Sequence, residues 1–156
     1  MSLDKVFNIA GSGMNAQTLR LNTTASNLAN AQSVSSSIDE TYRARKPVFA
    51  PILERYKQPA LTDEQGFENP VTSFNPEHVA GEGVQVLGIV ESDAPLQARF
   101  EPNHPMANDD GYVYYPNVNV VEEMTDMISA SRSYQTNVEV ANTAKQMMMK
   151  ILTLGQ

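Results

Sequence analysis

The chain has 156 residues, with 11 Lys and Arg against 18 Asp and Glu, two His and no Cys, and its net charge is −7. This length suits about one domain, and the absence of cysteine excludes both a disulfide framework and a cysteine-based metal site. The sequence has neither the eighteen or so consecutive apolar residues of a membrane span nor a basic start before a short apolar core, so we expect no membrane span and no cleaved secretory signal.

The first predicted element is a helix from Leu3 to Asn30. Apolar residues recur every seven positions, with others three or four positions away, which places them on one helical face as in a coiled-coil seam. We expect these residues to lie at subunit interfaces: Leu3, Phe7, Ala10, Met14, Leu21, Ala25 and Leu28.

The remaining faces of this helix are polar but almost uncharged. Only Asp4, Lys5 and Arg20 carry a charge, and most of the other polar residues are Asn, Ser, Thr or Gln. A solvated helix face normally carries Glu and Lys. Asn, Ser and Thr are also weak helix formers, so packing must hold this helix together. We therefore infer that its polar faces also meet protein.

The segment after the first helix is predicted to be extended and irregular. Ser33 to Ser37 is serine at four of five positions and favours a flexible joint. Tyr42 to Arg55 has an apolar pattern interrupted by Pro47 and Pro51, which indicates an edge strand or an extended arm. Residues 57–83 are rich in Pro, Gly and charged residues, and we interpret them as a long surface insertion.

Three further strands are predicted in the second half of the middle segment. Val84 to Val90 is rich in β-branched residues, Leu96 to Phe100 favours a second strand, and Tyr112 to Tyr115 favours a third. Asn108 to Gly111 has the composition of a tight turn between the last two.

The last predicted element is a helix from Val120 to Leu154, which would be about 50 Å long. Asn119 and Glu122 have the spacing of a capping box at its start. One row of a seam comprises Met124, Ser131, Val138, Lys145 and Leu152, and a second comprises Met127, Tyr134, Ala141 and Met148. From these rows and their flank we expect interface residues at Met124, Met127, Ile128, Tyr134, Val138, Ala141, Met148 and Leu152.

The elements together predict an α+β chain. Residues 1–32 and 118–156 would pair as a coiled-coil-like inner domain, and residues 33–117 would form a small β-rich, loop-rich outer domain with its insertion near 57–83. Residues 31–117 hold 13 acids and 6 bases, so the middle accounts for the whole net charge of −7. An acidic middle is typical of a solvated surface and argues against nucleic-acid binding, which favours a basic stripe.

Residues capable of chemistry are few and scattered. Asn108 to Gly111 lacks the spacing of a calcium loop, and His78 and His104 have no partner at metal-ligand spacing. Met147 to Met149 would point in three directions on a helix, which favours packing over soft-metal binding. The sequence therefore predicts no enzyme, cofactor or metal. Two alternatives stay open: a soluble coiled-coil adaptor, and a small hydrolase using His104 with Asp109 or Asp110.

The two ends also carry family motifs. The N-terminal helix contains Gly13 to Gln17, Leu19 to Asn22 and Ala25 to Ala31, and the C-terminal helix contains Ser129 to Asn137, Thr143 to Met147 and Leu152 to Gln156. These stretches resemble the paired signatures of bacterial flagellar rod, hook and related axial proteins. The middle is similar to that of a proximal rod member at Tyr42 to Ala44, Gly83 to Val86, Glu101 to Pro105, Tyr112 to Val113 and Pro116 to Met124.

This resemblance implies a structural subunit of the proximal rod, the axial drive shaft that transmits torque and encloses the export channel. It implies that the two terminal helices pair around that channel and that the middle forms an outer β-rich domain. The implied partners are copies of the chain, other proximal and distal rod subunits, the rod-to-MS-ring adaptor FliE and the flagellar type III export apparatus. The implied location is the periplasmic rod of the basal body, reached without signal cleavage.

Overall fold

The computed structural model describes residues 3–53 and 81–154, and its longest elements are the two expected helices. Helix α1 spans Leu3–Asn30, and helix α2 spans Val120–Leu154. The described residues between them form four strands: β1 (Arg45–Leu53), β2 (Gly81–Glu91), β3 (Gln97–Phe100) and β4 (Tyr112–Tyr115). The helices pack against each other beside a small β-containing middle, so the predicted α+β fold class is confirmed.

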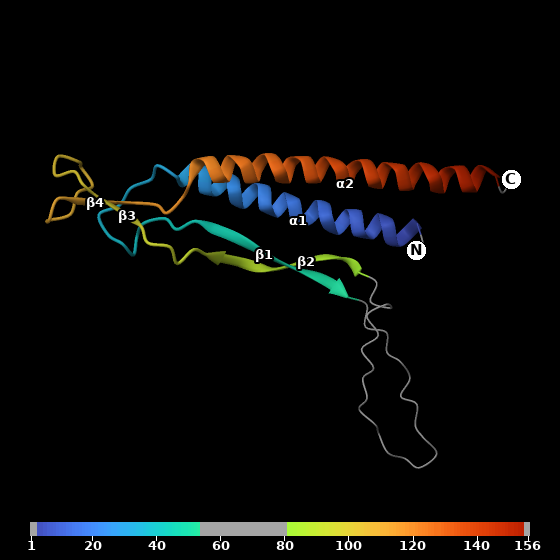
Figure 1. The fold of residues 1–156 in the computed structure, drawn as a ribbon, viewed down its shortest axis with the longest axis horizontal. Coiled ribbons are helices and arrows are strands. Elements are labelled where there is room, and N and C mark those ends of the chain that lie inside the picture. Colours follow the sequence, from blue (N-terminus) through green and yellow to red (C-terminus); the bar gives the residue numbers. More distant parts are fainter. Residues whose placement is uncertain (1–2, 54–80, 155–156) are drawn as a thin grey trace, which may run out of the picture.

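The molecule is elongated, with the two helices side by side and antiparallel (Figure 1). The start of α1 and the end of α2 lie at one end of the helix pair, and the β3–β4 ribbon lies at the other. The β1–β2 ribbon runs along α1, on the side away from α2 (Figure 1), and both of its strands contact α1. Helix α1 is therefore the middle layer of three.

Helix α2 begins at the predicted cap. The Oδ1 atom of Asn119 accepts a hydrogen bond from the Val121 amide at 3.1 Å, which satisfies a donor that the first turn leaves free. In a capping box, the Glu122 carboxylate would accept a hydrogen bond from the backbone amide of Asn119. This carboxylate instead accepts a hydrogen bond from Lys46 Nζ of β1, at 2.8 Å.

The β1–β2 ribbon is antiparallel, with Arg45 opposite Glu91 at one end and Leu53 opposite Gly81 at the other. Two register irregularities interrupt it, after Val48 and after Ile52. Among the described residues, strand β1 pairs only with β2, as expected for an edge strand that carries prolines.

A glycine lets this ribbon approach α1 closely. Gly83 has a φ of 132°, and a Cβ atom there would collide with the Ser12 hydroxyl of α1. That hydroxyl accepts a hydrogen bond from the Val84 amide at 3.2 Å and donates one to the Ile9 carbonyl at 2.8 Å. The sequence of β2 thus fixes the ribbon on the helix.

The β3–β4 ribbon contains the predicted turn. Gln97 lies opposite Tyr115, and Phe100 opposite Tyr112. Between these strands, Asn108 Oδ1 accepts hydrogen bonds from the Asp110 and Tyr112 amides, at 3.1 and 2.8 Å. Gly111 supplies the left-handed conformation that closes the turn, with a φ of 79°.

The serine segment after α1 differs from the flexible joint that we expected. Ser35 is buried and pairs with Tyr114 of β4: each amide donates to the other's carbonyl, at 3.1 and 2.9 Å. Backbone pairing therefore holds the segment in place.

Of the predicted insertion at 57–83, residues 57–80, including His78, lie outside the described residues. Neither described helix combines the length and apolarity that a membrane span requires.

Candidate assembly surface

The fully buried residues of α1 and α2 are mostly small. On α1 the buried positions are Ala10, Ala16, Thr23, Thr24 and Asn27, and on α2 they are Glu123, Ala130, Ala141 and Ala144. Gly13 also belongs to the contact, because a Cβ atom on it would lie 2.8 Å from Asn137 Nδ2 of α2. Small side chains let the two helix backbones approach closely.

Two cross-helix pairs fix the register of this seam. Gly13 lies beside Asn137, and Asn27 hydrogen-bonds Glu123. Gly13 and Asn27 are 14 residues apart, as are Glu123 and Asn137, so the two helices keep the same antiparallel register over two heptads. Continued at this register, Leu3 lies near the level of Met147, and the last turns of α2 extend past the start of α1 (Figure 1).

The apolar residues that we predicted at interfaces are mostly not fully buried within the chain. Only Ala10 and Ala141 are buried within the chain. The half-buried ones are Leu3, Met14, Leu21, Leu28, Met127 and Val138, and the exposed ones are Phe7, Ala25, Met124, Ile128, Tyr134, Met148 and Leu152. The monomer therefore leaves most of the predicted interface uncovered.

One predicted row of the α2 seam needs correction by one residue. We expected Met124 and Ser131 to face the partner helix, whereas Glu123 and Ala130 are buried and Met124 is 51% exposed. The reason is that a close contact selects small side chains, while the apolar pattern selects large ones. Further exposed large apolar residues of α2 include Val121, Ile128, Val140, Met147, Met149 and Ile151.

Asn27 is a buried side chain that joins several segments through hydrogen bonds, and the apolar pattern did not predict this role. Its Oδ1 atom accepts hydrogen bonds from the Tyr42 hydroxyl and the Arg45 amide, both at 2.9 Å, and its Nδ2 atom donates to the Arg45 carbonyl at 2.8 Å. The side chain is 1% exposed. Its amide thus replaces a neighbouring strand for Arg45 and ties α1 to β1. The one available signal was the uncharged polar face of α1.

The buried carboxylate beside Asn27 belongs to α2. Burial raises the pKa of Glu123, a hydrogen bond from Asn27 and the Lys46 ammonium act against that rise, and nearby Asp126 and Glu122 add to it. At the surface beside it, the hydrogen bond between Lys46 and Glu122 raises the pKa of Lys46 and lowers that of Glu122. These charges join β1 to the start of α2.

A second asparagine closes the junction between the ribbons. Asn117 Oδ1 accepts from the Ala44 amide at 2.7 Å, and its Nδ2 donates to the carbonyls of Ser92 and Ala94 at 3.2 and 2.8 Å. The Ser92 amide in turn donates to the Ala44 carbonyl at 2.8 Å. The segments entering β1, leaving β2 and entering α2 are therefore fixed at one point.

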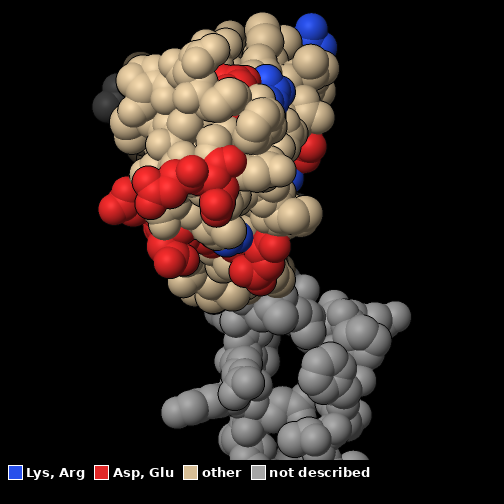
Figure 2. Space-filling model, turned by 90° about the vertical axis from the view of Figure 1, so that its left-hand side faces the viewer, with Lys and Arg blue, Asp and Glu red and all other residues tan. Residues whose placement is uncertain are grey.

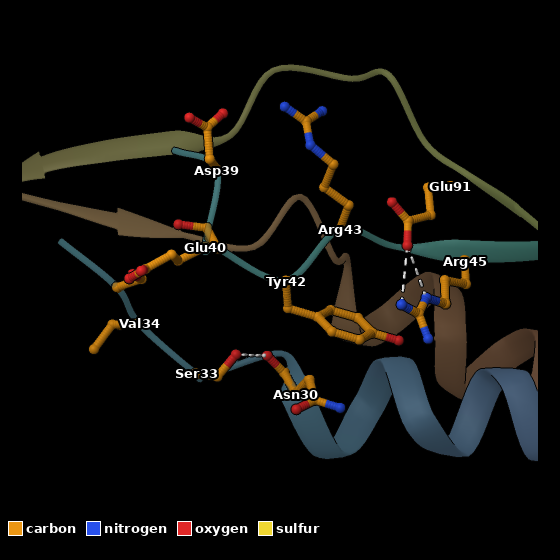
Figure 3. Close-up of a pocket in the computed structure, with 11 residues that line it drawn as sticks. Asn30, Ser33, Val34, Asp39, Glu40, Tyr42, Arg43, Arg45 and Glu91 are labelled. Carbon is orange, nitrogen blue, oxygen red and sulfur yellow. Dashed lines mark hydrogen bonds and ion pairs between the residues drawn. The ribbon is translucent and has the colours of Figure 1, made fainter. Parts of the chain in front are cut away.

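An open groove of about 530 Å³ lies beside this junction (Figure 3). Its cations already have acceptors: Nε and Nη2 of Arg45 donate to Glu91 Oε1 at 3.1 and 2.9 Å, and Arg43 Nη1 donates to the Ser92 carbonyl at 3.4 Å. Asp39 and Glu40 complete the charged lining. This arrangement suits the bracing of the loop better than the capture of a charged ligand.

The residues of the hydrolase alternative serve the turns instead. His104 Nδ1 accepts a hydrogen bond from the Met106 amide at 3.1 Å, while Asp109 and Asp110 are exposed. No cluster of three or more His, Asp or Glu side chains with metal-binding geometry occurs among the described residues.

The end of the molecule that carries β3 and β4 is acidic. Figure 2 looks at this end and shows acidic side chains gathered across it with few basic ones. The two segments there, residues 31–44 and 92–117, hold six acids (Asp39, Glu40, Asp93, Glu101, Asp109 and Asp110) against Arg43 and Arg99. None of these carboxylates forms an ion pair with another described residue, and Arg99 lies 4.5 Å from the ring centroid of Tyr115. We name this surface the acidic end.

The family models match both helical regions. The flagella basal body rod protein model matches residues 7–34, and the flagellar basal body rod FlgEFG C-terminal model matches residues 109–154. Similar proteins, all named flagellar basal-body rod protein FlgC, occur in Salmonella typhimurium (45% identical), Escherichia coli O6:H1 (46%) and Borreliella burgdorferi (35%). Each comparison covers 100% of this chain and at least 99% of the relative. The matched helices and full-length likeness show that the chain belongs to the FlgC family of flagellar basal-body rod proteins.

Proposed function

We propose that this chain, a structural rod protein by its family, polymerises through the outer faces of its terminal helices into the proximal rod. The observation that carries the proposal is the placement of side-chain size. Alanine, glycine and asparagine fill the seam within the chain, while Val121, Met124 and Ile128 are 73%, 51% and 55% exposed. Such a surface is costly in water and typical of a subunit that buries it on assembly.

The proposal assigns a role to each part of the chain. Residues 1–32 and 118–156 would form an inner domain around the export channel, and residues 33–117 would form the outer domain. The acidic end and the solvated β ribbons support an outer position for the middle. Helices that each contact several neighbours would resist bending and twisting, as the transmission of torque from the motor requires.

Partners and location follow as parts of the same proposal. We expect contacts with copies of the chain, with proximal and distal rod subunits and with the adaptor FliE. We also expect passage through the flagellar type III export apparatus, without signal cleavage, to the periplasmic part of the basal body. The long exposed apolar faces support the contacts with other subunits, because they cannot be covered in one monomer.

The test places a charge on the predicted interfaces. Leu28→Asp and Tyr134→Asp, expressed in cells that lack the native chain, should each abolish motility and leave basal bodies without complete rods. Leu28→Met and Tyr134→Phe are the matched controls and should swim normally. Normal rods with either aspartate variant would contradict the proposal.

The adaptor alternative predicts a different surface. A soluble two-helix adaptor would carry Glu and Lys on its outer faces, whereas residues 140–154 of α2 contain Lys145, Lys150 and no acid, with large apolar residues between them. The outer surface therefore favours burial between subunits over exposure to water.

A further inference from the structure

Glu123 is the one charged side chain that lies buried in the described part of the chain, with 4% of its surface exposed. It belongs to the first turn of α2, where α2 meets Asn27 of α1 and Lys46 of β1. A carboxylate taken out of water favours its neutral form unless charges and hydrogen bonds replace the lost water. The groups around Glu123 therefore decide which form this side chain adopts.

The hydrogen-bond donors beside Glu123 are largely occupied elsewhere. Asn27 Nδ2 donates to the Arg45 carbonyl as well as to Glu123, and Asn27 Oδ1 accepts from the Arg45 amide and the Tyr42 hydroxyl. The Arg45 guanidinium pairs with Glu91 instead. All four hydrogen-bonding positions of the Asn27 amide are thus filled, and one of them serves Glu123. An ionised carboxylate offers about four acceptor sites, so this single donor satisfies it poorly.

The charges beside Glu123 do not make up for this shortage. The Lys46 ammonium lies 2.8 Å from the exposed carboxylate of Glu122. Asp126, one turn further along α2, and Glu122 both oppose a further negative charge at Glu123. Helix α1 adds no charge, because residues 21–30 contain none. One lysine therefore faces three carboxylates. We name Asn27, Lys46, Glu122, Glu123 and Asp126 the Glu123 cluster.

We propose that the Glu123 cluster holds α1, β1 and the start of α2 together while Glu123 is protonated, and loosens when this carboxyl ionises. An ionised Glu123 would need water, and water reaches it only if the start of α2 moves away from α1 and β1. Asn27 bonds both Glu123 and Arg45, so this movement would also free the Arg45 backbone. The device lies within the single chain and does not depend on the proposed assembly.

The direction of the pH effect follows from the two glutamates. Burial raises the pKa of Glu123, so its contribution to stability is present below its unfolded pKa and is lost as pH rises through the folded value. The hydrogen bond from Lys46 lowers the pKa of Glu122, so that contribution is present above its unfolded pKa and is lost as pH falls. The cluster should therefore be firmest in mildly acidic solution and loosen toward neutral pH through Glu123.

Hydrogen exchange on the full-length chain tests the proposal at the Arg45 amide, which donates to Asn27 at 2.9 Å. Its protection factor, referred to an unfolded peptide at each pH, should fall roughly threefold or more from pH 5 to pH 8. The Tyr114 amide, bonded to the Ser35 carbonyl outside the cluster, is the internal reference and should not follow this fall. Equal protection of the Arg45 amide at both pH values would overturn the proposal.

Substitutions then assign the effect to Glu123. Glu123→Gln should keep the high protection up to pH 8, whereas Glu139→Gln, at an exposed position further along α2, should leave the fall unchanged. Asp126→Asn removes a repelling charge and should move the midpoint of the fall to lower pH, and Lys46→Met should move it to higher pH. A fall that persists in Glu123→Gln would overturn the proposal, as would a midpoint that neither charge substitution moves.

Titration of the unsubstituted chain covers the case in which Glu123→Gln does not fold. Carbon-13 NMR follows the side-chain carboxyl of Glu123 in the native protein as pH is raised. Its midpoint should lie above the range of an exposed glutamate, and the loss of Arg45 protection should follow the same curve. A midpoint within or below that range would refute the proposal without any variant.

Discussion

The inner and outer faces of the helix pair differ in the opposite sense from an ordinary monomeric domain. The inner face has alanines and glycine, with Ala130 and Ala144 at 0% and 3% exposure, while Val121 and Ile128 on α2 are 73% and 55% exposed. A monomer stabilises itself by burying its largest apolar side chains. Here large apolar side chains are exposed, so we expect the stability of the chain and that of its proposed assembly to depend on separate residues.

The outer face provides the strongest test of this separation. Met124→Asp and Ile128→Asp together should abolish swimming, because each places a charge where we expect a subunit contact. The isolated chain should keep its stability to within about 0.5 kcal/mol, because surface substitutions change it little. Motility and urea unfolding are the measurements, with Met124→Leu and Ile128→Leu as controls. A loss of motility accompanied by a clear loss of stability in the isolated chain would contradict the separation.

The inner face should respond in the reverse way. Ala130→Leu adds three carbons to a fully buried position between the helices and should cost about 1–3 kcal/mol of unfolding free energy. Ser129→Leu adds a side chain of the same size one residue away, where the surface is exposed, and should cost far less. Thermal unfolding of both variants measures the difference. Comparable losses at the two positions would show that the seam is not tightly packed.

The contact between the ribbon and α1 should be sensitive to a single methyl group. Gly83→Ala should cost about 1–3 kcal/mol, because its backbone conformation disfavours alanine and the methyl group would meet Ser12. Gly88→Ala, also in β2, meets nothing within 4 Å and is the matched control. Hydrogen exchange at Val84 should rise in the first variant only. Unchanged protection of that amide would argue against the close contact.

The buried carboxylate should have the smallest and most pH-dependent effect. Because the pKa of Glu123 is raised in the folded state, this group favours folding below its unfolded pKa, and that contribution disappears as pH rises through the folded value. Glu123→Gln should therefore unfold at higher urea concentration than the native chain at pH 7, and at a similar concentration near pH 3. A variant that is less stable at pH 7 would show that the ionised carboxylate is satisfied by Asn27 and Lys46.

Local sequence determined the elements of this protein. Apolar spacing located both helices, Asn119 fixed the start of α2, and proline and turn residues placed β1 and the Asn108 turn. These features depend on neighbours within a few residues, so the sequence carries them directly. The uncharged helix faces also indicated contact with other protein segments. Some of their hydroxyls, such as those of Thr18 and Thr125, donate to carbonyls one turn earlier in the same helix and need no partner from another segment.

Only the tertiary structure decided which face of each helix turns inward. Apolar spacing favoured Met124 for the seam, yet Glu123 and Ala130 are the buried residues. Helix α2 lies close to Gly13 and Asn27 of α1, and side chains of α2 fit there only if they are small or hydrogen-bonded. The serine segment was likewise fixed by pairing with Tyr114, which lies far away in the sequence. Such choices depend on contacts between distant segments, and a pattern within one helix cannot encode the shape of the surface that meets it.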